Sequence, residues 1–169
     1  PWFDLAAAQP YGFDLPPDDP PDPARLNFRR AELLRQVMLD NGDADGALLT
    51  AAYGWHAALP GDPADSPWNS VSPEQQANWA TEAADWARRN WPWSAGLAWA
   101  WWQPPQPVGD PHWGFALAVP NGDPTPALAS LETWNATAHP LGAGLWPPDD
   151  PAVSETGGWR LTGQAADPP

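Results

Sequence analysis

The apolar run from Ala47 to Ala52, which lies between Gly46 and Tyr53-Gly54-Trp55-His56, constrains the fold more than any other stretch. A continuous apolar run of this length, bounded by turn residues, predicts a strand covered on both faces, as in a parallel sheet. One amphipathic pattern precedes the run and another follows it, which predicts alternating helices and strands. In such folds the loops that leave the carboxyl ends of strands carry function, so residues 52–56 are the first candidate site.

Patterns elsewhere in the chain extend this alternation. Strands are predicted at 2–9 and 94–102, helices from Leu26 to Asn41, from Pro73 to about Asn90 and from Pro126 to Trp134, and an extra strand at 113–119. Ser72 and Gln75 predict a capping box at the start of the second helix. Gly42 suits the left-handed position that ends the first helix.

The predicted fold class is therefore α/β, with right-handed parallel units in the order β-α-β-α-β-α. Residues 1–137 form one predicted domain, and residues 138–169 are expected to hold a Pro- and Gly-rich linker and the first strand of a β-rich domain. Three parallel strands leave two open edges and an incomplete core. We expect the chain to be part of something longer, completed by an N-terminal half or by another protein chain.

Composition excludes several functions. The net charge of −14 argues against nucleic acid as a partner, because phosphate binding needs a basic surface. The absence of Cys excludes disulfides and thiolate metal sites, and no two His residues have a metal-ligand spacing. The acidic segments 18–22 and 43–45 lack the full ligand spacing of a calcium loop and are interpreted as solvated turns. No cofactor, no metal and no membrane span is expected.

A family resemblance emerges from four segments taken in order: Ala8-Gln9-Pro10-Tyr11-Gly12, Ala51-Ala52-Tyr53-Gly54-Trp55, residues 90–102 and residues 124–131. Together they resemble landmarks in the later strands and last helix of clan A-type bacterial glycoside hydrolases, relatives of the cellulase and β-xylosidase families. The resemblance covers about residues 3–134. It implies the C-terminal part of a (β/α)₈ TIM barrel, with strands six to eight and their helices, followed by a linker.

The departures from that family concern its catalytic residues. In the family, the seventh strand carries a Glu nucleophile, and the matching position here is Ala52. The acid/base Glu of the fourth strand would lie upstream of this chain, and Gln9 stands where a His is usual. Retaining hydrolysis needs two carboxyl groups, so the chain as it stands is expected to be inactive, whether Ala52 is natural or engineered. The predicted substrate-binding residues are Gln9, Tyr11, Tyr53, Trp55, His56, Trp99 and Trp101.

Two interpretations of the Trp residues remain open. Indoles at the carboxyl ends of strands can stack on sugar rings, whereas Trp79, Trp86, Trp91 and Trp93 are more readily explained as packing. The chain is thus predicted to be an inactive glycoside hydrolase-like module that retains carbohydrate binding. The alternative is a structural or accessory subunit of a larger extracytoplasmic or membrane-attached complex. The resemblance implies an extracellular or extracytoplasmic location.

Overall fold

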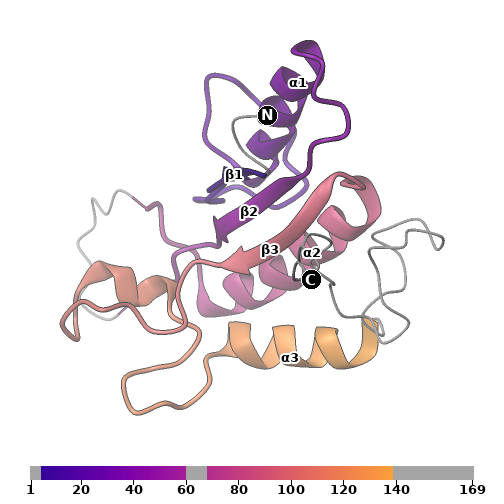
Figure 1. The fold of residues 1–169 in the computed structure, drawn as a ribbon. Helices are drawn as coiled ribbons and strands as arrows, with labels where there is room; N and C mark the ends of the chain where they lie inside the picture. Colours follow the sequence, from indigo (N-terminus) through magenta and orange to yellow (C-terminus); the bar gives the residue numbers. More distant parts are fainter. Residues whose placement is uncertain (1–4, 60–67, 139–169) are drawn as a thin grey trace, which may run out of the picture.

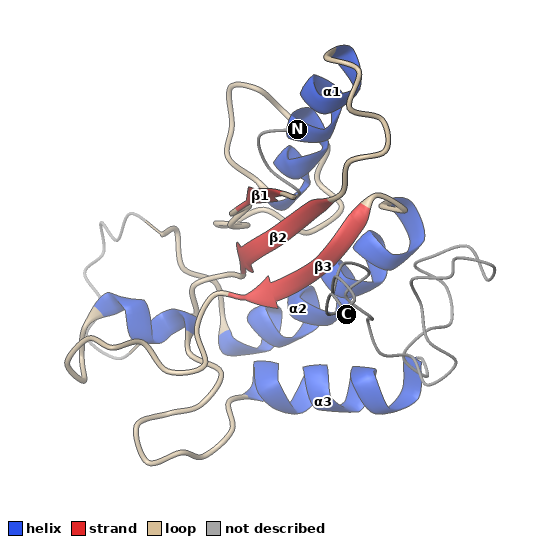
Figure 2. Ribbon diagram, viewed as in Figure 1, coloured by secondary structure: helices blue, strands red, loops and turns tan. Residues whose placement is uncertain are grey.

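The structure, a computed structural model, describes residues 5–59 and 68–138. Strands and helices alternate along these residues, as Figures 1 and 2 show. The elements are β1 (Ala6–Ala8), η1 (Phe28–Arg30), α1 (Ala31–Asp40), β2 (Leu48–Tyr53), α2 (Pro73–Asn90), β3 (Ser94–Trp99), η2 (Pro111–Phe115) and α3 (Pro126–Ala138). The predicted α/β class is confirmed.

The three strands form one parallel sheet in the order β1-β2-β3. Leu48 in the central strand is level with Ala6 of β1 and with Ser94 of β3. Sheet order, direction and the helix after each strand agree with the predicted part of a (β/α)₈ barrel. In the described ranges the sheet is open, so its place in a closed barrel stays a prediction.

The two faces of the sheet differ. Residues of one face, including Ala6, Ala8 and Leu97, pack against the main core together with the buried Leu48. On the other face Ala7 is exposed and Leu49 is partly exposed, and a Cβ at Gly96 would meet Leu49 Cδ1 at 3.8 Å. The helices therefore cover one face, and the opposite face carries small apolar residues.

The main core is aromatic. Phe28 stacks on Trp91 at a centroid separation of 4.9 Å, and both rings are almost fully buried. α2 presents Ala83 and Ala87 to this cluster, and their short side chains let the helix approach the large rings closely. Close packing of this kind explains the Ala-rich sequence of α2.

A partly buried ion pair between η1 and α1 is linked to the end of α2 through Trp91. Arg29 Nε donates to Glu32 Oε1 at 2.8 Å, and Trp91 Nε1 donates to the same oxygen at 2.9 Å. Arg29 also lies 4.2 Å above the Trp86 ring, a cation–π contact. Burial alone would raise the pKa of Glu32, but the hydrogen bonds from Arg29 and Trp91 and the Arg29 charge lower it below its usual value.

Both predicted helix boundary signals are confirmed. Ser72 Oγ accepts from Gln75 N at 3.1 Å, and Gln75 Oε1 accepts from Ser72 N at the same distance, which completes the capping box. Gly42 has a φ of 81° just after α1, a conformation that glycine adopts without strain.

Two predicted boundaries and one predicted strand are corrected. The helix from Leu26 begins later, because Asn27 has extended backbone and the chain then passes through η1 into α1. β3 ends at Trp99, and beyond it the carbonyls of Trp101 and Trp102 accept N–H groups from Leu117 and Ala118. The extra strand predicted at 113–119 is wrong: this segment holds the end of η2 and then isolated bridges.

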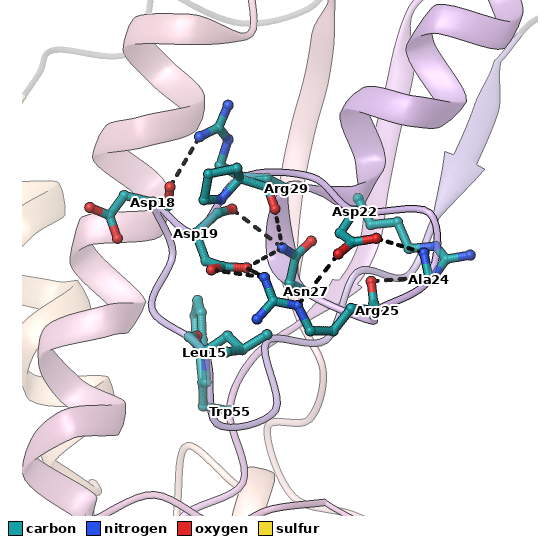
Figure 3. Close-up of polar contacts among 11 residues, drawn as sticks. Leu15, Asp18, Asp19, Asp22, Ala24, Arg25, Asn27, Arg29 and Trp55 are labelled. Carbon is teal, nitrogen blue, oxygen red and sulfur yellow. Dashed lines mark hydrogen bonds and ion pairs between the residues drawn. The ribbon is translucent and has the colours of Figure 1, made fainter.

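The Pro- and Asp-rich segment after β1 runs over the surface, and polar contacts hold it in place (Figure 3). Asn27 Nδ2 donates to Asp19 Oδ2 at 2.6 Å and to the Pro20 carbonyl at 2.7 Å. Arg25 forms an ion pair with the same Asp19 carboxylate at 3.0 Å. Asp19 therefore ties this segment to the start of η1.

The linker and strand predicted at 138–169 lie outside the described residues, apart from the last residue of α3. None of the helices in the described ranges is long and apolar enough to cross a membrane.

Candidate functional site

Loops that follow all three strands bring aromatic side chains together at the carboxyl ends of the sheet. We call Tyr11, Phe13, Trp68, His112 and Phe115 the carboxyl-edge cluster. The Phe115 ring centroid lies 5.2 Å from that of Tyr11 and 5.0 Å from that of Trp68. Trp68 also stacks on Phe13 at 6.2 Å and meets His112 at 6.1 Å. Aromatic pairs at these separations attract one another beyond the burial of apolar area, so the three loops form one unit.

Phe115 is positioned by η2, which begins after Asp110. The Asp110 carboxylate accepts a hydrogen bond from the His112 backbone N–H at 2.9 Å and from His112 Nδ1 at 2.7 Å. These bonds, the backbone one first, lower the pKa of Asp110 below its usual value. They also fix the imidazole beside Trp68. Among the described residues Nε2 of His112 has no hydrogen-bond partner, so it is the ring atom open to a ligand.

At the carboxyl end of β2, Tyr53 and Trp55 are buried, and Trp55 is 0% exposed. The Trp55 indole donates from Nε1 to the Leu15 carbonyl at 2.8 Å, as Figure 3 shows. A Cβ atom at Gly12 would lie 1.9 Å from Trp55 Nε1, so only glycine fits at that position. Burial raises the pKa of the Tyr53 phenol, which stays neutral. Trp55 therefore holds the loop after β1 against the sheet, and the Tyr53 ring packs against Phe28 and Trp99 in the core.

His56 is also fully buried. Its Nε2 lies 2.6 Å from the Pro111 carbonyl, which can only accept, so Nε2 carries the proton and donates. In the neutral ring Nδ1 then accepts from the Ser70 hydroxyl at 2.7 Å. The imidazole joins the loop after β2 to η2, and contact with a sugar would need these loops to separate.

The carboxyl end of β3 is more open. Trp99 is partly buried: its Nε1 donates to the Phe115 carbonyl at 2.7 Å, and its ring lies 5.2 Å from that of Tyr53. Trp101 is partly buried and Trp102 is 59% exposed. In the part of the chain that the structure describes, neither of these two indole N–H groups has a hydrogen-bond partner. Each therefore presents an aromatic face and a free donor.

At the carboxyl end of β1, Gln9 is exposed and Tyr11 is partly buried. Burial raises the pKa of the Tyr11 phenol, so it is neutral over the physiological range. Both residues line a groove beside β1.

Position 52, near the carboxyl end of β2, carries no carboxylate. Ala52 is 8% exposed near the end of β2, and its methyl group cannot attack a glycosidic carbon. Retaining hydrolysis needs two carboxyl groups about 5–5.5 Å apart, and position 52 supplies none. Within residues 5–59 and 68–138, no group of three or more His, Asp or Glu side chains could hold a metal ion.

The structure brings most of the predicted site residues together. The Tyr53 ring meets both Trp55 and Trp99, and Phe115 contacts both Tyr11 and His56. Gln9 instead lines the groove beside β1, and the Trp101 ring has no aromatic partner among the described residues.

Trp68, His112 and Phe115 were not among the site residues predicted from the sequence. The signal for the last two was Asp110 followed by Pro111, because Asp is a favoured N-cap and Pro a favoured first residue of a helix. That pair would have predicted η2 in place of a strand.

Comparisons with known proteins give little information on the family of this chain. No protein-family model matches the sequence, and no curated protein matches it. Among solved structures, the Faecalibacterium prausnitzii Beta-glucuronidase is similar with a TM-score of 0.47 and 16% sequence identity. The match covers 80% of this chain and 22% of that chain, so the chain spans less than a quarter of the length of that structure. At this TM-score and identity, the similarity assigns neither a fold family nor an activity.

Proposed function

We propose that the protein is a carbohydrate-binding module of glycoside hydrolase-like fold that does not hydrolyse its ligand. The observation that carries this proposal is the pair Trp101 and Trp102 at the carboxyl end of β3. Their rings are partly or largely exposed, and their N–H groups lack partners among the described residues. An indole offers an apolar face to the C–H groups of a sugar ring and a donor to its hydroxyls.

The carboxyl-edge cluster, at the same end of the sheet, supports the same proposal. The carboxyl-edge cluster is fixed by contacts among three loops, so little conformational entropy is lost when a ligand binds beside it. His112 Nε2 adds a polar group at the same edge. A rigid aromatic platform with a few oriented polar groups is typical of small-molecule sites.

The proposed inactivity follows from Ala52. With a methyl group at the position of the family nucleophile, no glycosyl-enzyme ester can form. The module would act outside the cytoplasm, the location typical of the family that its sequence resembles.

The test is a titration of the purified chain with a panel of β-linked oligosaccharides, followed by intrinsic Trp fluorescence. The expected result is a saturable spectral change, with no turnover of aryl glycosides. An Ala52→Glu variant that gains turnover would place position 52 at the ancestral nucleophile site. If the folded chain gives no spectral change with any oligosaccharide, carbohydrate binding is rejected.

A second function, that of a structural subunit, is favoured by the uncovered face of the sheet. Ala7 and Ala98 are exposed there, although parallel sheets are normally buried on both faces. A chain that binds no sugar but forms a stable complex through this face would support the second function.

A further inference from the structure

Ser70 and His56 form a hydrogen-bonded pair that carbohydrate binding does not use. Ser70 Oγ lies 2.7 Å from His56 Nδ1, and His56 Nε2 lies 2.6 Å from the Pro111 carbonyl. Because that carbonyl can only accept, Nε2 carries the proton, and the lone pair of Nδ1 faces the Ser70 hydroxyl. A hydroxyl, a neutral imidazole that accepts from it and a third group that orients the imidazole together make the arrangement that activates a serine nucleophile.

The two members of the pair differ in exposure as such a reaction requires. His56 is 0% exposed, whereas Ser70 is partly exposed. A substrate can therefore reach the hydroxyl from the surface, while the base stands behind it in the interior of the protein. Hydrogen bonds at both ring nitrogens fix the orientation of the imidazole.

The backbone sets Ser70 beside His56. Val71 N donates to the His56 carbonyl at 2.8 Å, and Ala58 N donates to the Val71 carbonyl at 2.9 Å. A parallel bridge between Ala57 and Val71 joins the two segments in one register. The hydroxyl and the imidazole are thus in place before a substrate arrives, and positioning of this kind lowers the barrier of a reaction.

Two backbone N–H groups next to the hydroxyl are open to a ligand. Within residues 5–59 and 68–138, neither the Asn69 N–H nor the Ser70 N–H has a hydrogen-bond partner. When a nucleophile attacks a carbonyl group, negative charge develops on the carbonyl oxygen, and backbone N–H groups are common donors to that charge. The peptide groups of Asn69 and Ser70 therefore supply donors of the required type at the required residue.

We propose that Ser70 and His56 form a catalytic dyad that hydrolyses acyl esters. Ser70 Oγ attacks the carbonyl carbon of the ester, and its proton passes to His56 Nδ1, while Nε2 keeps its bond to the Pro111 carbonyl. The tetrahedral intermediate expels the alcohol, which takes the proton from Nδ1 and leaves an acyl ester on Ser70. Water then attacks this ester with His56 as the base, and the carboxylic acid and the free serine hydroxyl are released.

Aromatic rings beside the dyad suit a short acyl group. The Phe115 ring centroid lies 5.3 Å from that of His56 and 5.0 Å from that of Trp68. Because these rings already pack on one another, a short group such as acetyl is favoured over a long chain. The activity concerns ester bonds and needs no carboxylate at position 52, so it is separate from glycoside hydrolysis.

The first test is hydrolysis of para-nitrophenyl acetate by the full chain, by Ser70→Ala and by the control Ser130→Ala. Ser130, like Ser70, is partly exposed, but it lies on α3. Wild type and Ser130→Ala should hydrolyse the ester at equal rates, and Ser70→Ala should be slower by roughly 100-fold or more, because it lacks the nucleophile that the imidazole activates. Circular dichroism checks that each variant is folded.

A covalent probe tests the nucleophile in the wild-type chain. A fluorophosphonate should form a phosphonate ester with Ser70 Oγ, with loss of fluoride, and peptide mass spectrometry locates the label. Ser72 should stay unlabelled, because its hydroxyl accepts from Gln75 N and has no imidazole partner among the described residues. The proposal is overturned if Ser70→Ala hydrolyses the ester as fast as the wild type, or if the probe does not label Ser70. Neither measurement depends on sugar binding, so the two proposals fail separately.

Discussion

The carboxyl ends of β2 and β3 lie at the same level of the sheet, and aromatic residues follow both strands, yet these side chains have different roles. After β2, Trp55 and His56 are fully buried, and their ring nitrogens bond to loop residues that come from elsewhere in the chain. After β3, Trp101 and Trp102 are partly or largely exposed, without hydrogen-bond partners for their N–H groups among the described residues. Position at a strand end does not by itself make an aromatic residue a ligand contact. What separates a packing role from a ligand-contact role here is whether the indole N–H has a hydrogen-bond partner within the described residues.

The largest effect should come from Trp55→Ala. Removal of a fully buried indole leaves a cavity and an unpaired Leu15 carbonyl, and it should lower the free energy of unfolding by about 3–5 kcal/mol. Trp102→Ala, the matched control after β3, should change it by less than about 0.5 kcal/mol. Urea unfolding measures both. Equal losses would mean that the two strand ends do not differ as described.

Gly12→Ala tests the same contact from the other side. A Cβ atom there would strike the Trp55 ring, and the repacking should cost about 1–3 kcal/mol of unfolding free energy. In a Trp55→Leu background the cost should shrink, because the smaller side chain leaves room. Thermal unfolding of the wild type, the two single variants and the double variant gives the coupling free energy between positions 12 and 55. Additive losses would show that Gly12 is not constrained by Trp55.

Glu32→Gln should lower the free energy of unfolding by about 1–2 kcal/mol near neutral pH, because a charged acceptor for Arg29 and two indoles is lost. The pKa of Glu32 is lowered in the folded protein, so its contribution is full above the ordinary value of 4.5 and is lost as the pH falls through the folded value. Wild type and variant should therefore converge in stability as the pH falls below the folded-state pKa of Glu32. A gap that is constant with pH would contradict the charge-based account.

Trp101→Ala should have only a small effect on stability, below about 1 kcal/mol, since its ring is partly buried. It should still weaken oligosaccharide binding by roughly tenfold or more, as expected for an aromatic binding contact. Trp93→Ala is the matched control, because this partly buried indole lies at the amino end of the same strand. Calorimetric titration compares the two variants. Equal affinities would remove Trp101 from the site.

Much of the fold could be predicted from the sequence because it depends on local patterns. The apolar run at 47–52, the Ser72 capping box and Gly42 each report the conformation of their own neighbourhood, and each has a counterpart in the structure. The prediction of an extra strand at 113–119 was wrong because it gave the apolar residues of this segment more weight than the helix start at Asp110-Pro111.

The candidate site could be predicted only in part. Periodicity places Trp55 and Trp101 at strand ends, but it cannot show that Gly12 lets Trp55 reach the Leu15 carbonyl. Nor can it show that Phe115, from a loop after β3, joins Tyr11 to His56. These are contacts between segments about 40 to 100 residues apart, and they decide which rings are buried.

The central claim is that the indoles after β3 meet a ligand and those after β2 do not. Indole N–H signals in a ¹H–¹⁵N NMR spectrum report on the 14 Trp residues one by one, once they are assigned by substitution. On titration with the oligosaccharide panel, the signals of Trp101 and Trp102 should shift with a common saturation curve, while those of Trp55 and Trp91 stay in place. A spectrum in which no indole signal moves with any sugar, or in which Trp55 moves first, would contradict the account.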